Sequence, residues 1–247
     1  MKNIIVIPAR MASSRLPEKP LAMIEGKSLI QRVYEQTSAC HNIHEIIVAT
    51  DHPKILDHVL SFGGKAVMTS DQHPSGTDRI AEVAQFTDGD IFINVQGDEP
   101  FIHPGQINDL LGVFSNPEVS IATQMSVMTD VDEIFDFNKV KVVTDIHNRA
   151  LYFSRQAIPA HRDIPYREWP EKTVYYKHIG IYAFRKKSLL EVSALQPGYL
   201  ERMESLEQLR WLEYGHAVHC FPTAYESVGV DTAEDLEKAI ILARNIF

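Results

Sequence analysis

The stretch IIVIPARMASSRLPEKPL, residues 4–21, decides the fold class of this chain. It opens with four β-branched apolar residues, which is typical of a buried strand, and Pro8 then ends the run. The loop that follows brings three cations together, Arg10, Arg15 and Lys19. Because ligands of an open parallel sheet bind beyond the carboxyl ends of its strands, this loop is a candidate binding segment.

The loop after this first strand has the composition of an anion-binding segment. Ala9, Ala12 and Ser13 are small, so backbone N–H groups can approach an anion closely, and the prolines stiffen the turn. The three cations suit the oxygens of a triphosphate. Neither the GxGxxG pattern of dinucleotide sites nor the GxxxxGK[ST] pattern of phosphate-binding loops is present, which disfavours both of those families. The alternative is a solvated loop with ordinary surface charges.

Short apolar runs alternate with helix-like segments in the amino-terminal part of the chain. The expected strands cover 4–7, 45–50 and 90–96, and the expected helices cover 28–39, 53–64 and 78–86. Strands that alternate with helices predict a parallel α/β sheet, and the nearly continuous apolar character of these strands indicates that both faces are covered.

From about residue 118 to residue 185 the pattern changes, because strand-like segments follow one another with few helical gaps. This segment is expected to be an antiparallel or mixed insertion on the α/β core. Beyond it we expect a helix at 204–215, strands at 216–221 and 225–230, and a helix at 232–245 capped by Thr232. The prediction is a single domain, 1–247, with a strand-rich sub-lobe at about 118–185.

The composition is that of an ordinary globular chain, with 247 residues and a formal net charge of -9. An acidic chain lacks a general electrostatic footprint for nucleic acid or for an anionic membrane, so neither is an expected partner. No apolar stretch has the length of a signal peptide or of a membrane span. Cys40 and Cys220 form no CxxC pair, which fits a reducing compartment, and we expect a cytoplasmic protein.

Two acidic side chains are expected at the carboxyl ends of strands. Asp98 follows the third expected strand, within the sequence GDEP, and Asp231 follows the expected strand 225–230. Mg²⁺ takes one or two protein carboxylates and keeps waters or phosphate oxygens as its other ligands, so these two acids are candidates for a shared ion. Alternatively, Asp98 is part of a structural turn between Gly97 and Pro100, and Asp231 is a residue at the entry to a helix.

The segment HPSGTDRIAEVA, residues 73–84, indicates the start of a helix. Thr77 is the expected N-cap, Asp78 stands in the first turn, and Gly76 lets the backbone approach a flat ligand closely. Taken alone, the segment is a capped helix whose Arg79 faces the solvent.

The chain resembles the 3-deoxy-manno-octulosonate cytidylyltransferases over most of its length. The blocks that carry the resemblance occur in the family's order, and they are PARMASSRLPEKPL, HPSGTDRIAEVA, NVQGDEP, KVVTD, ALYFSRQAIP, HIGIYAFR, ESLEQLR and GVDTAEDL. The FSR, HIGIY and ESLEQLR blocks together are specific to this family among related sugar nucleotidyltransferases. Glu18 stands where the family usually has Gly, Gln156 and Ala157 replace Ala-Pro, and Ala233 replaces Pro.

The resemblance implies a three-layer α/β nucleotidyltransferase fold with a Rossmann-like, mostly parallel sheet, and a homodimer formed through the strand-rich sub-lobe. It also implies a reaction. The anomeric hydroxyl of the eight-carbon sugar acid 3-deoxy-D-manno-octulosonate (Kdo) attacks the α-phosphate of CTP, pyrophosphate leaves, and CMP-Kdo forms for lipopolysaccharide. No covalent intermediate is expected, because no Ser-His-acid or Cys-His arrangement is discernible.

Carried onto the matching positions, the resemblance makes Arg10, Lys19, Asp98 and Asp231 the catalytic residues, with Asp98 and Asp231 as the ligands of Mg²⁺. Arg10 and Lys19, with Ser13 and Arg15 nearby, bind the CTP phosphates in the family pattern. The implied nucleotide site, whose last four members resemble the cytosine and ribose pocket, consists of Pro8, Ala9, Arg10, Ser13, Arg15, Lys19, Ser75, Gly76, Arg79 and Gln96.

A sugar acid with a carboxylate and many hydroxyls needs a cation and several hydrogen-bonding side chains. By resemblance these are Arg155, His178, Tyr182, Glu207 and Gln208. The alternative from the residues alone is an ordinary strand for HIGIYAFR, and a helix whose Glu207 and Gln208 face water.

Two other readings share parts of this pattern. A sialic-acid-type cytidylyltransferase or another sugar-1-phosphate nucleotidyltransferase has a similar first loop, but the HIGIY and ESLEQLR blocks argue against both. A non-catalytic nucleotide-binding regulator is the alternative from another class. The acids at Asp98 and Asp231 argue against it, because binding alone needs no metal aligned at the α-phosphate.

Overall fold

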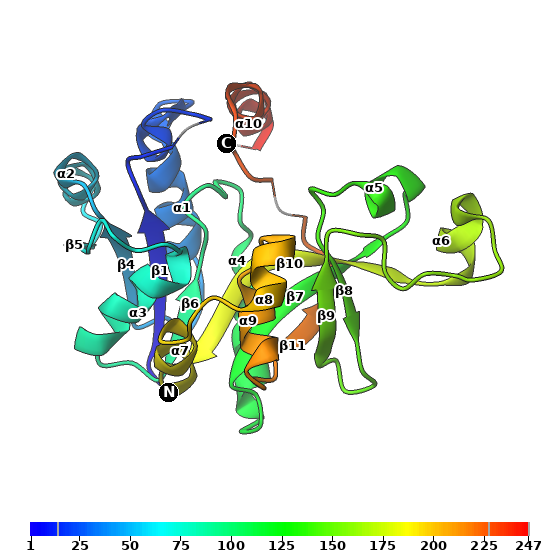
Figure 1. Cartoon of the computed structure of the whole chain (residues 1–247). Helices are drawn as coiled ribbons and strands as arrows, with labels where there is room; N and C mark the ends of the chain where they lie inside the picture. Colours follow the sequence, from blue (N-terminus) through cyan, green and yellow to red (C-terminus); the bar gives the residue numbers. More distant parts are fainter. Residues whose placement is uncertain (14, 227, 247) are drawn as a thin grey trace. The chain divides into compact units, whose positions relative to one another are not determined.

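The computed structural model describes residues 1–13, 15–226 and 228–246, which form two compact units (Figure 1). Unit 1 contains Met1–Leu111, Ala183–Ser193 and Glu226–Phe247, and unit 2 contains Gly112–Tyr182 and Ala194–Tyr225. Unit 2 therefore takes in the strand-rich segment up to Tyr182 and also residues 194–225, which the sequence pattern left outside the sub-lobe.

Unit 1 is built on a parallel sheet. Its strands β1 (Asn3–Ala9), β4 (Glu45–Thr50), β5 (Ala66–Met68) and β6 (Ile91–Asn94) lie in the order β6-β1-β4-β5, and every pair is parallel. Ile5 is fully buried at the centre, where it pairs with Ile46 on one side and Ile93 on the other. Apolar residues run continuously along β1 because both faces of the sheet are covered. The predicted mostly parallel α/β class is confirmed.

The helices of unit 1 cover the two faces of this sheet. Helices α1 (Leu29–Ser38) and α2 (Pro53–Ser61) lie on one face, and α3 (Gly76–Phe86) and α7 (Lys186–Ser193) lie on the other (Figure 1). This division follows from right-handed crossovers between parallel strands. The remaining elements of unit 1 are η1 (Lys19–Leu21), the small hairpin β2 (Met23–Ile24) and β3 (Lys27–Ser28), α4 (Pro104–Gly112, whose last residue belongs to unit 2) and α10 (Ala233–Ile246).

Unit 2 is rich in strands of mixed direction. Its strands are β7 (Ile121–Met128), β8 (Lys141–Thr144), β9 (Ala150–Ser154), β10 (Tyr175–Arg185, whose last three residues belong to unit 1) and β11 (His219–Pro222). β11 is parallel to β7, whereas β8 is antiparallel to both β9 and β10. The helical elements are η2 (Val113–Ser115), α5 (Val131–Phe135), η3 (Tyr166–Glu168), α6 (Trp169–Lys172), α8 (Tyr199–Glu204) and α9 (Gln208–Glu213).

Two predicted elements of the carboxyl-terminal part differ from the structure. The helix expected at 204–215 is present as the shorter α9, because α8 ends at Glu204 and Ser205 takes the left-handed conformation, with φ 53°, before α9 begins at Gln208. The second element is the strand expected at 225–230. Its described residues, 225, 226 and 228–230, form no strand, and Ser227 is outside the described residues. That segment instead leads directly to the start of α10.

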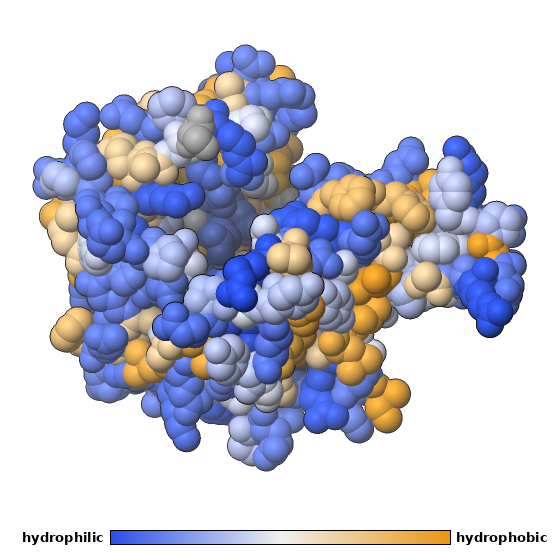
Figure 2. Space-filling model, viewed as in Figure 1, coloured by the Kyte–Doolittle hydropathy of each residue, from blue (hydrophilic) through white to orange (hydrophobic). Residues whose placement is uncertain are grey.

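The face seen in Figure 2 is mostly hydrophilic, and apolar side chains are exposed on the β8–β9 hairpin. Ile146, in its turn, and Leu151, in β9, are both largely exposed. Within the described residues, no helix combines the length and the apolar character that a membrane crossing requires.

Candidate functional site

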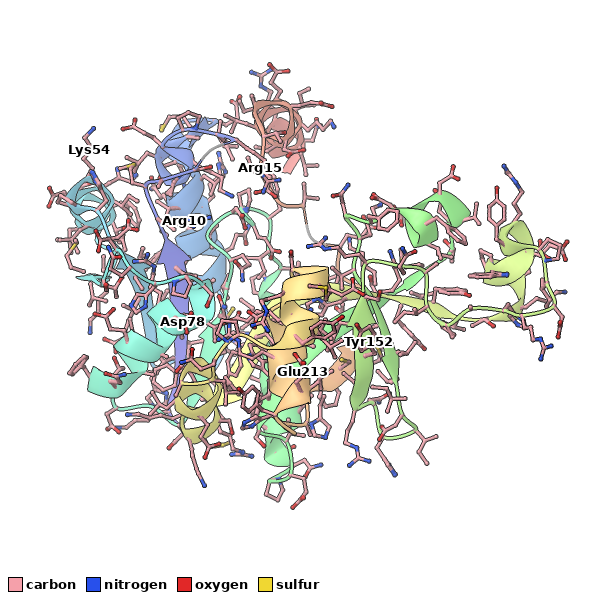
Figure 3. The ribbon with its side chains drawn as sticks, viewed as in Figure 1. Arg10, Arg15, Lys54, Asp78, Tyr152 and Glu213 are labelled. Atoms are coloured by element: carbon pink, nitrogen blue, oxygen red, sulfur yellow. The ribbon has the colours of Figure 1, made fainter. Side chains whose placement is uncertain are left out.

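A cavity of about 420 Å³ lies in unit 1, at the carboxyl ends of β1 and β6. Its lining includes every residue of the predicted nucleotide site, together with Asp98 and Asp231. Figure 3 shows Arg10 at the carboxyl end of β1 and Arg15 further along the same loop. Ala12, which belongs to the predicted anion-binding loop, also lines the cavity, and so do four chain neighbours of the predicted residues that the sequence pattern did not indicate: Pro20, His73, Pro74 and Gly97.

The side chain of Lys19 contacts both predicted metal ligands, Asp98 and Asp231. Its ammonium donates to Oδ2 of Asp98 over 2.6 Å and to Oδ1 of Asp231 over 3.0 Å. The Lys19 side chain is 17% exposed, against 28% for Asp98 and 46% for Asp231. Burial lowers the pKa of Lys19, but the two carboxylates outweigh burial and the pKa is raised. Arg15 adds a second cation 3.2 Å from Asp231.

Asp231 reaches Asp98 through backbone contacts rather than through a strand. The N–H of Val230 donates to the carbonyl of Asp98 over 2.8 Å, which holds the two segments together. The predicted origin of Asp231 at a strand end is therefore wrong, and the residue stands at the entry to α10. There Thr232 accepts from the N–H of Asp235 over 3.2 Å, so the predicted cap is confirmed.

The Asp235 carboxylate completes this capping arrangement. Its Oδ2 accepts from the N–H of Asp231 over 3.2 Å and from the N–H of Thr232 over 3.0 Å. The hydrogen bond from the Thr232 hydroxyl is the main cause that lowers the pKa of Asp235. The helix start therefore fixes the backbone on both sides of Asp231.

The turn that carries Asp98 packs directly on the end of β1. A Cβ added to Gly97 would lie 2.7 Å from the carbonyl oxygen of Pro8, which is closer than any side chain tolerates. Glycine is therefore required where the backbone after β6 passes β1, and this close approach places Asp98 beside the first loop.

Helix α3 begins at the cavity, but its cap differs from the prediction. Ser75 is the N-cap, since its hydroxyl oxygen accepts from the N–H of Asp78 over 3.1 Å. Thr77, the expected cap, is buried inside the first turn. Ser75 and Gly76 line the cavity, so the positive end of the α3 dipole faces it.

Arg79 is buried rather than solvent-facing, so the alternative reading of this residue is wrong. Its guanidinium donates to Thr69 Oγ1 over 2.6 Å and forms an ion pair with Asp51 Oδ2 at 3.0 Å. Asp51 was not among the residues predicted from the sequence. The signal was present, because Asp51 directly follows β4, at the carboxyl end of a parallel strand.

The predicted sugar-binding residues lie in unit 2. His178 and Tyr182 share one face of β10, with ring centroids 5.3 Å apart, and Tyr182 meets Trp211 edge to face. Burial lowers the pKa of His178 to about 3, so the imidazole is neutral at physiological pH.

Thr123 selects the tautomer of this neutral imidazole. The Thr123 hydroxyl lies 2.9 Å from the carbonyl of Ile179 and 2.8 Å from that of Ile181. Carbonyls only accept, so the single hydroxyl hydrogen points to one of them, and His178 Nε2, at 3.0 Å, then donates to the hydroxyl oxygen. This assignment leaves Nδ1 as a hydrogen-bond acceptor.

Tyr182 brings β10 together with the start of α9. Burial raises the pKa of Tyr182 well above its ordinary value, and Cys220 and the Glu207 carboxylate raise it further. Gln208 is buried, so the alternative that places Gln208 in water is wrong for this residue, while Glu207 is half-buried.

Arg155 follows β9 and is held by backbone carbonyls. Its guanidinium donates to the carbonyl oxygens of Glu204, Phe137 and Ser205 over 2.7, 3.1 and 3.4 Å. The Glu204 carboxylate accepts from the N–H of Arg155 over 2.9 Å and from the Ser154 hydroxyl over 2.7 Å. In this structure the Arg155 side chain therefore anchors the end of α8.

Known proteins resemble this chain along its whole length. A protein of Parabacteroides distasonis named 3-deoxy-manno-octulosonate cytidylyltransferase is 47% identical over 99% of both chains. A Cytophaga hutchinsonii protein of the same name is 47% identical over 94% of both. A solved structure of a CMP:2-keto-3-deoxy-manno-octonic acid synthetase complexed with CTP superposes with a TM-score of 0.94 at 43% identity and covers all of both chains. The family model described as cytidylyltransferase matches residues 4–227, so the predicted resemblance is confirmed and the chain belongs to the cytidylyltransferase family.

Proposed function

We propose that this cytidylyltransferase transfers the cytidylyl group of CTP to the anomeric hydroxyl of Kdo. The hydroxyl oxygen forms a bond to the α-phosphorus of CTP, the bond to pyrophosphate breaks, and the hydroxyl loses its proton. One observation carries the proposal: relatives 47% identical along nearly the whole chain bear the name of this activity. The product is the activated sugar acid used for lipopolysaccharide.

The cavity in unit 1 is the proposed CTP site. Arg10, Arg15 and Lys19 stand on one loop of an acidic chain, where they supply positive charge for the triphosphate. The start of α3 adds backbone N–H groups and the positive end of a helix dipole. We assign Arg79 and Gln96 to the cytosine and ribose. Transfer of a phosphoryl-type group depends mainly on alignment and charge stabilisation, which this arrangement suits.

The residues at the cavity fit a divalent cation. Asp98 and Asp231 offer carboxylate oxygens on two sides of the Lys19 ammonium, so this position already accommodates a positive charge. Two carboxylates with space for phosphate oxygens and waters are the ligand set that Mg²⁺ prefers. We propose that Asp98 and Asp231 hold Mg²⁺ with bound CTP. When bound, Mg²⁺ neutralises charge on the phosphate oxygens and lowers the pKa of the attacking hydroxyl.

The proposed Kdo site is in unit 2. His178 presents Nδ1 as an acceptor for a sugar hydroxyl, and Tyr182, Glu207 and Gln208 supply further hydrogen-bonding groups. We assign Arg155 to the sugar carboxylate, because its remaining N–H groups can pair with a carboxylate while the carbonyl contacts hold its side chain.

We also propose that the two units work as one nucleotidyltransferase domain, that the protein is a homodimer and that it acts in the cytoplasm. The exposed apolar side chains Ile146 and Leu151 on the β8–β9 hairpin support a dimer contact through unit 2.

Pyrophosphate release tests this function. The purified protein is mixed with CTP, UTP, ATP or GTP, with Kdo, with sialic acid or with no acceptor, and with Mg²⁺ or EDTA. We expect release only with CTP, Kdo and Mg²⁺ together. Release with sialic acid instead of Kdo would indicate the sialic-acid-type activity. CTP binding without turnover on any acceptor would indicate a nucleotide-binding regulator and contradict the proposal.

A further inference from the structure

Asp51 and Thr69 hold the buried guanidinium of Arg79 from two directions. The ion pair between Arg79 and Asp51 is well shielded, with side chains 5% and 14% exposed. Thr69 donates its hydroxyl hydrogen to the carbonyl of Thr50 over 3.1 Å, so its oxygen accepts from Arg79 over 2.6 Å. The donor and acceptor assignments are therefore unambiguous at both contacts.

The second oxygen of Asp51 reaches the first loop. The N–H of Met11 donates to Asp51 Oδ1 over 3.2 Å, while Arg79 occupies Oδ2. Met11 stands between Arg10 and Ala12, and both of these residues line the cavity. One carboxylate at the end of β4 thus sets the position of two separate parts of the cavity wall.

Asp51 acts on the cavity through these partners. Arg79 is among the described residues that line the cavity, and Asp51 is not. A guanidinium has five N–H donors, and the described contacts of Arg79 use two of them. Because Asp51 and Thr69 fix the plane of the guanidinium, the remaining donors have one orientation relative to the cavity.

We propose that Asp51 is a positioning residue that sets CTP affinity and base discrimination by orienting Arg79 and the Met11 segment. This inference rests on the proposed assignment of the cavity to CTP. Arg79 is held before the nucleotide arrives, so binding requires no ordering of this side chain. Loss of the carboxylate leaves a buried guanidinium partly unpaired and free to turn.

Asp51→Asn tests this role with a side chain of nearly the same shape. The amide has a single acceptor oxygen, so only one of Arg79 and the N–H of Met11 can keep its acceptor, while the other meets the amide N–H₂, and the negative charge opposite Arg79 is lost in either orientation. Calorimetric titration should show CTP affinity weakened about tenfold or more, the ratio expected for a lost charged hydrogen bond. The preference for CTP over UTP should fall as well, and in turnover KM for CTP should change far more than kcat.

Three variants control the experiment. Asp88→Asn removes an exposed ion pair with Lys2 in the same unit and should leave CTP affinity unchanged. Thr69→Val removes the second contact of Arg79 and should weaken CTP binding in the same way, and Thr69→Ser, which keeps the hydroxyl, should restore it. If Asp51→Asn does not fold, the comparison of Thr69→Val with Thr69→Ser tests the positioning of Arg79 in its place.

The outcomes separate this inference from the proposed function. Unchanged CTP affinity and base preference in folded Asp51→Asn, or in Thr69→Val, would overturn the positioning role. A fall in kcat with unchanged CTP affinity would also overturn it. Because the titration needs no acceptor, CTP binding that depends on Asp51 supports the inference even if Kdo fails as a substrate, and that failure would count against the proposed function alone.

Discussion

The Lys19 ammonium lies 2.6 Å from Oδ2 of Asp98 and 3.0 Å from Oδ1 of Asp231, at the position that we propose for a divalent cation. At the proposed metal site, the Lys19 ammonium and the metal would therefore compete for the same carboxylate oxygens until the triphosphate of CTP offers Lys19 new partners. This relationship favours an order of binding in which the nucleotide precedes or accompanies the metal.

Lys19→Met should therefore have opposite effects on metal binding and on turnover. Without nucleotide, the variant should bind Mn²⁺ more tightly than the natural chain, because both carboxylates lose the Lys19 ammonium and Asp231 keeps only the exposed Arg15 as a cationic partner. Its rate should fall about 100-fold or more, as is usual when a group that stabilises developing charge is removed. Paramagnetic titration of free Mn²⁺ and pyrophosphate release measure the two effects. Mn²⁺ affinity equal to that of the natural chain would contradict the competition.

Gly97→Ala should destabilise the turn that carries Asp98 and weaken the proposed CTP site. The new methyl group meets the Pro8 carbonyl at 2.7 Å, and both are backbone-fixed, so β1 and the turn must separate. We expect a loss of about 1–3 kcal/mol in the free energy of unfolding and a raised KM for CTP. Urea denaturation and steady-state kinetics check both. Gly112→Ala, whose methyl group has no neighbour within 4 Å, is the matched control.

Glu18→Gly should stabilise the protein. Glu18 has φ 53° and ψ 30°, the left-handed conformation that costs a residue with a Cβ about 1 kcal/mol or more. The family usually has Gly at this position, and its exposed ion pair with Lys54 at 3.3 Å contributes little. Glu18→Ala loses the same ion pair but keeps the Cβ. Thermal unfolding should rank Gly above Ala, and equal stability of the two variants would show that the turn carries no strain.

His178 should make stability decline as the pH falls. Its pKa is about 3 in the folded chain because of burial, while an exposed histidine titrates near about 6.5. Between these values the unfolded chain binds a proton that the folded chain does not, so the free energy of unfolding falls with decreasing pH, by up to about 1.4 kcal/mol per unit. His178→Asn removes this contribution. Urea denaturation at pH 7 and pH 5 should show the smaller decline in the variant, and equal declines would contradict the shift.

The first loop and the turn after β6 were predictable from sequence because local chemistry defines them. An apolar strand followed by small residues and cations identifies the carboxyl end of β1, and GDEP identifies the turn that carries Asp98. The parallel α/β class was predictable from strands that alternate with helices along the chain, because a parallel sheet requires a crossover between successive strands.

The parts that sequence missed depend on contacts between distant segments. Asp231 reaches the cavity through the hydrogen bond from Val230 to Asp98, which no local pattern indicates. Arg79 was open to a solvent-facing reading, because its partners Asp51 and Thr69 come from other loops. The break at Ser205 was missed because a left-handed serine leaves no signal in a helical pattern.

The central test asks whether Asp98 and Asp231 bind the metal. The affinity for Mn²⁺ is measured from its paramagnetic signal, with CTP present and Kdo absent. Asp98→Asn and Asp231→Asn should each weaken Mn²⁺ binding about tenfold or more, while Asp88→Asn should bind as the natural chain does. Mn²⁺ affinity in both site variants equal to that of the natural chain, with CTP still bound, would contradict the account.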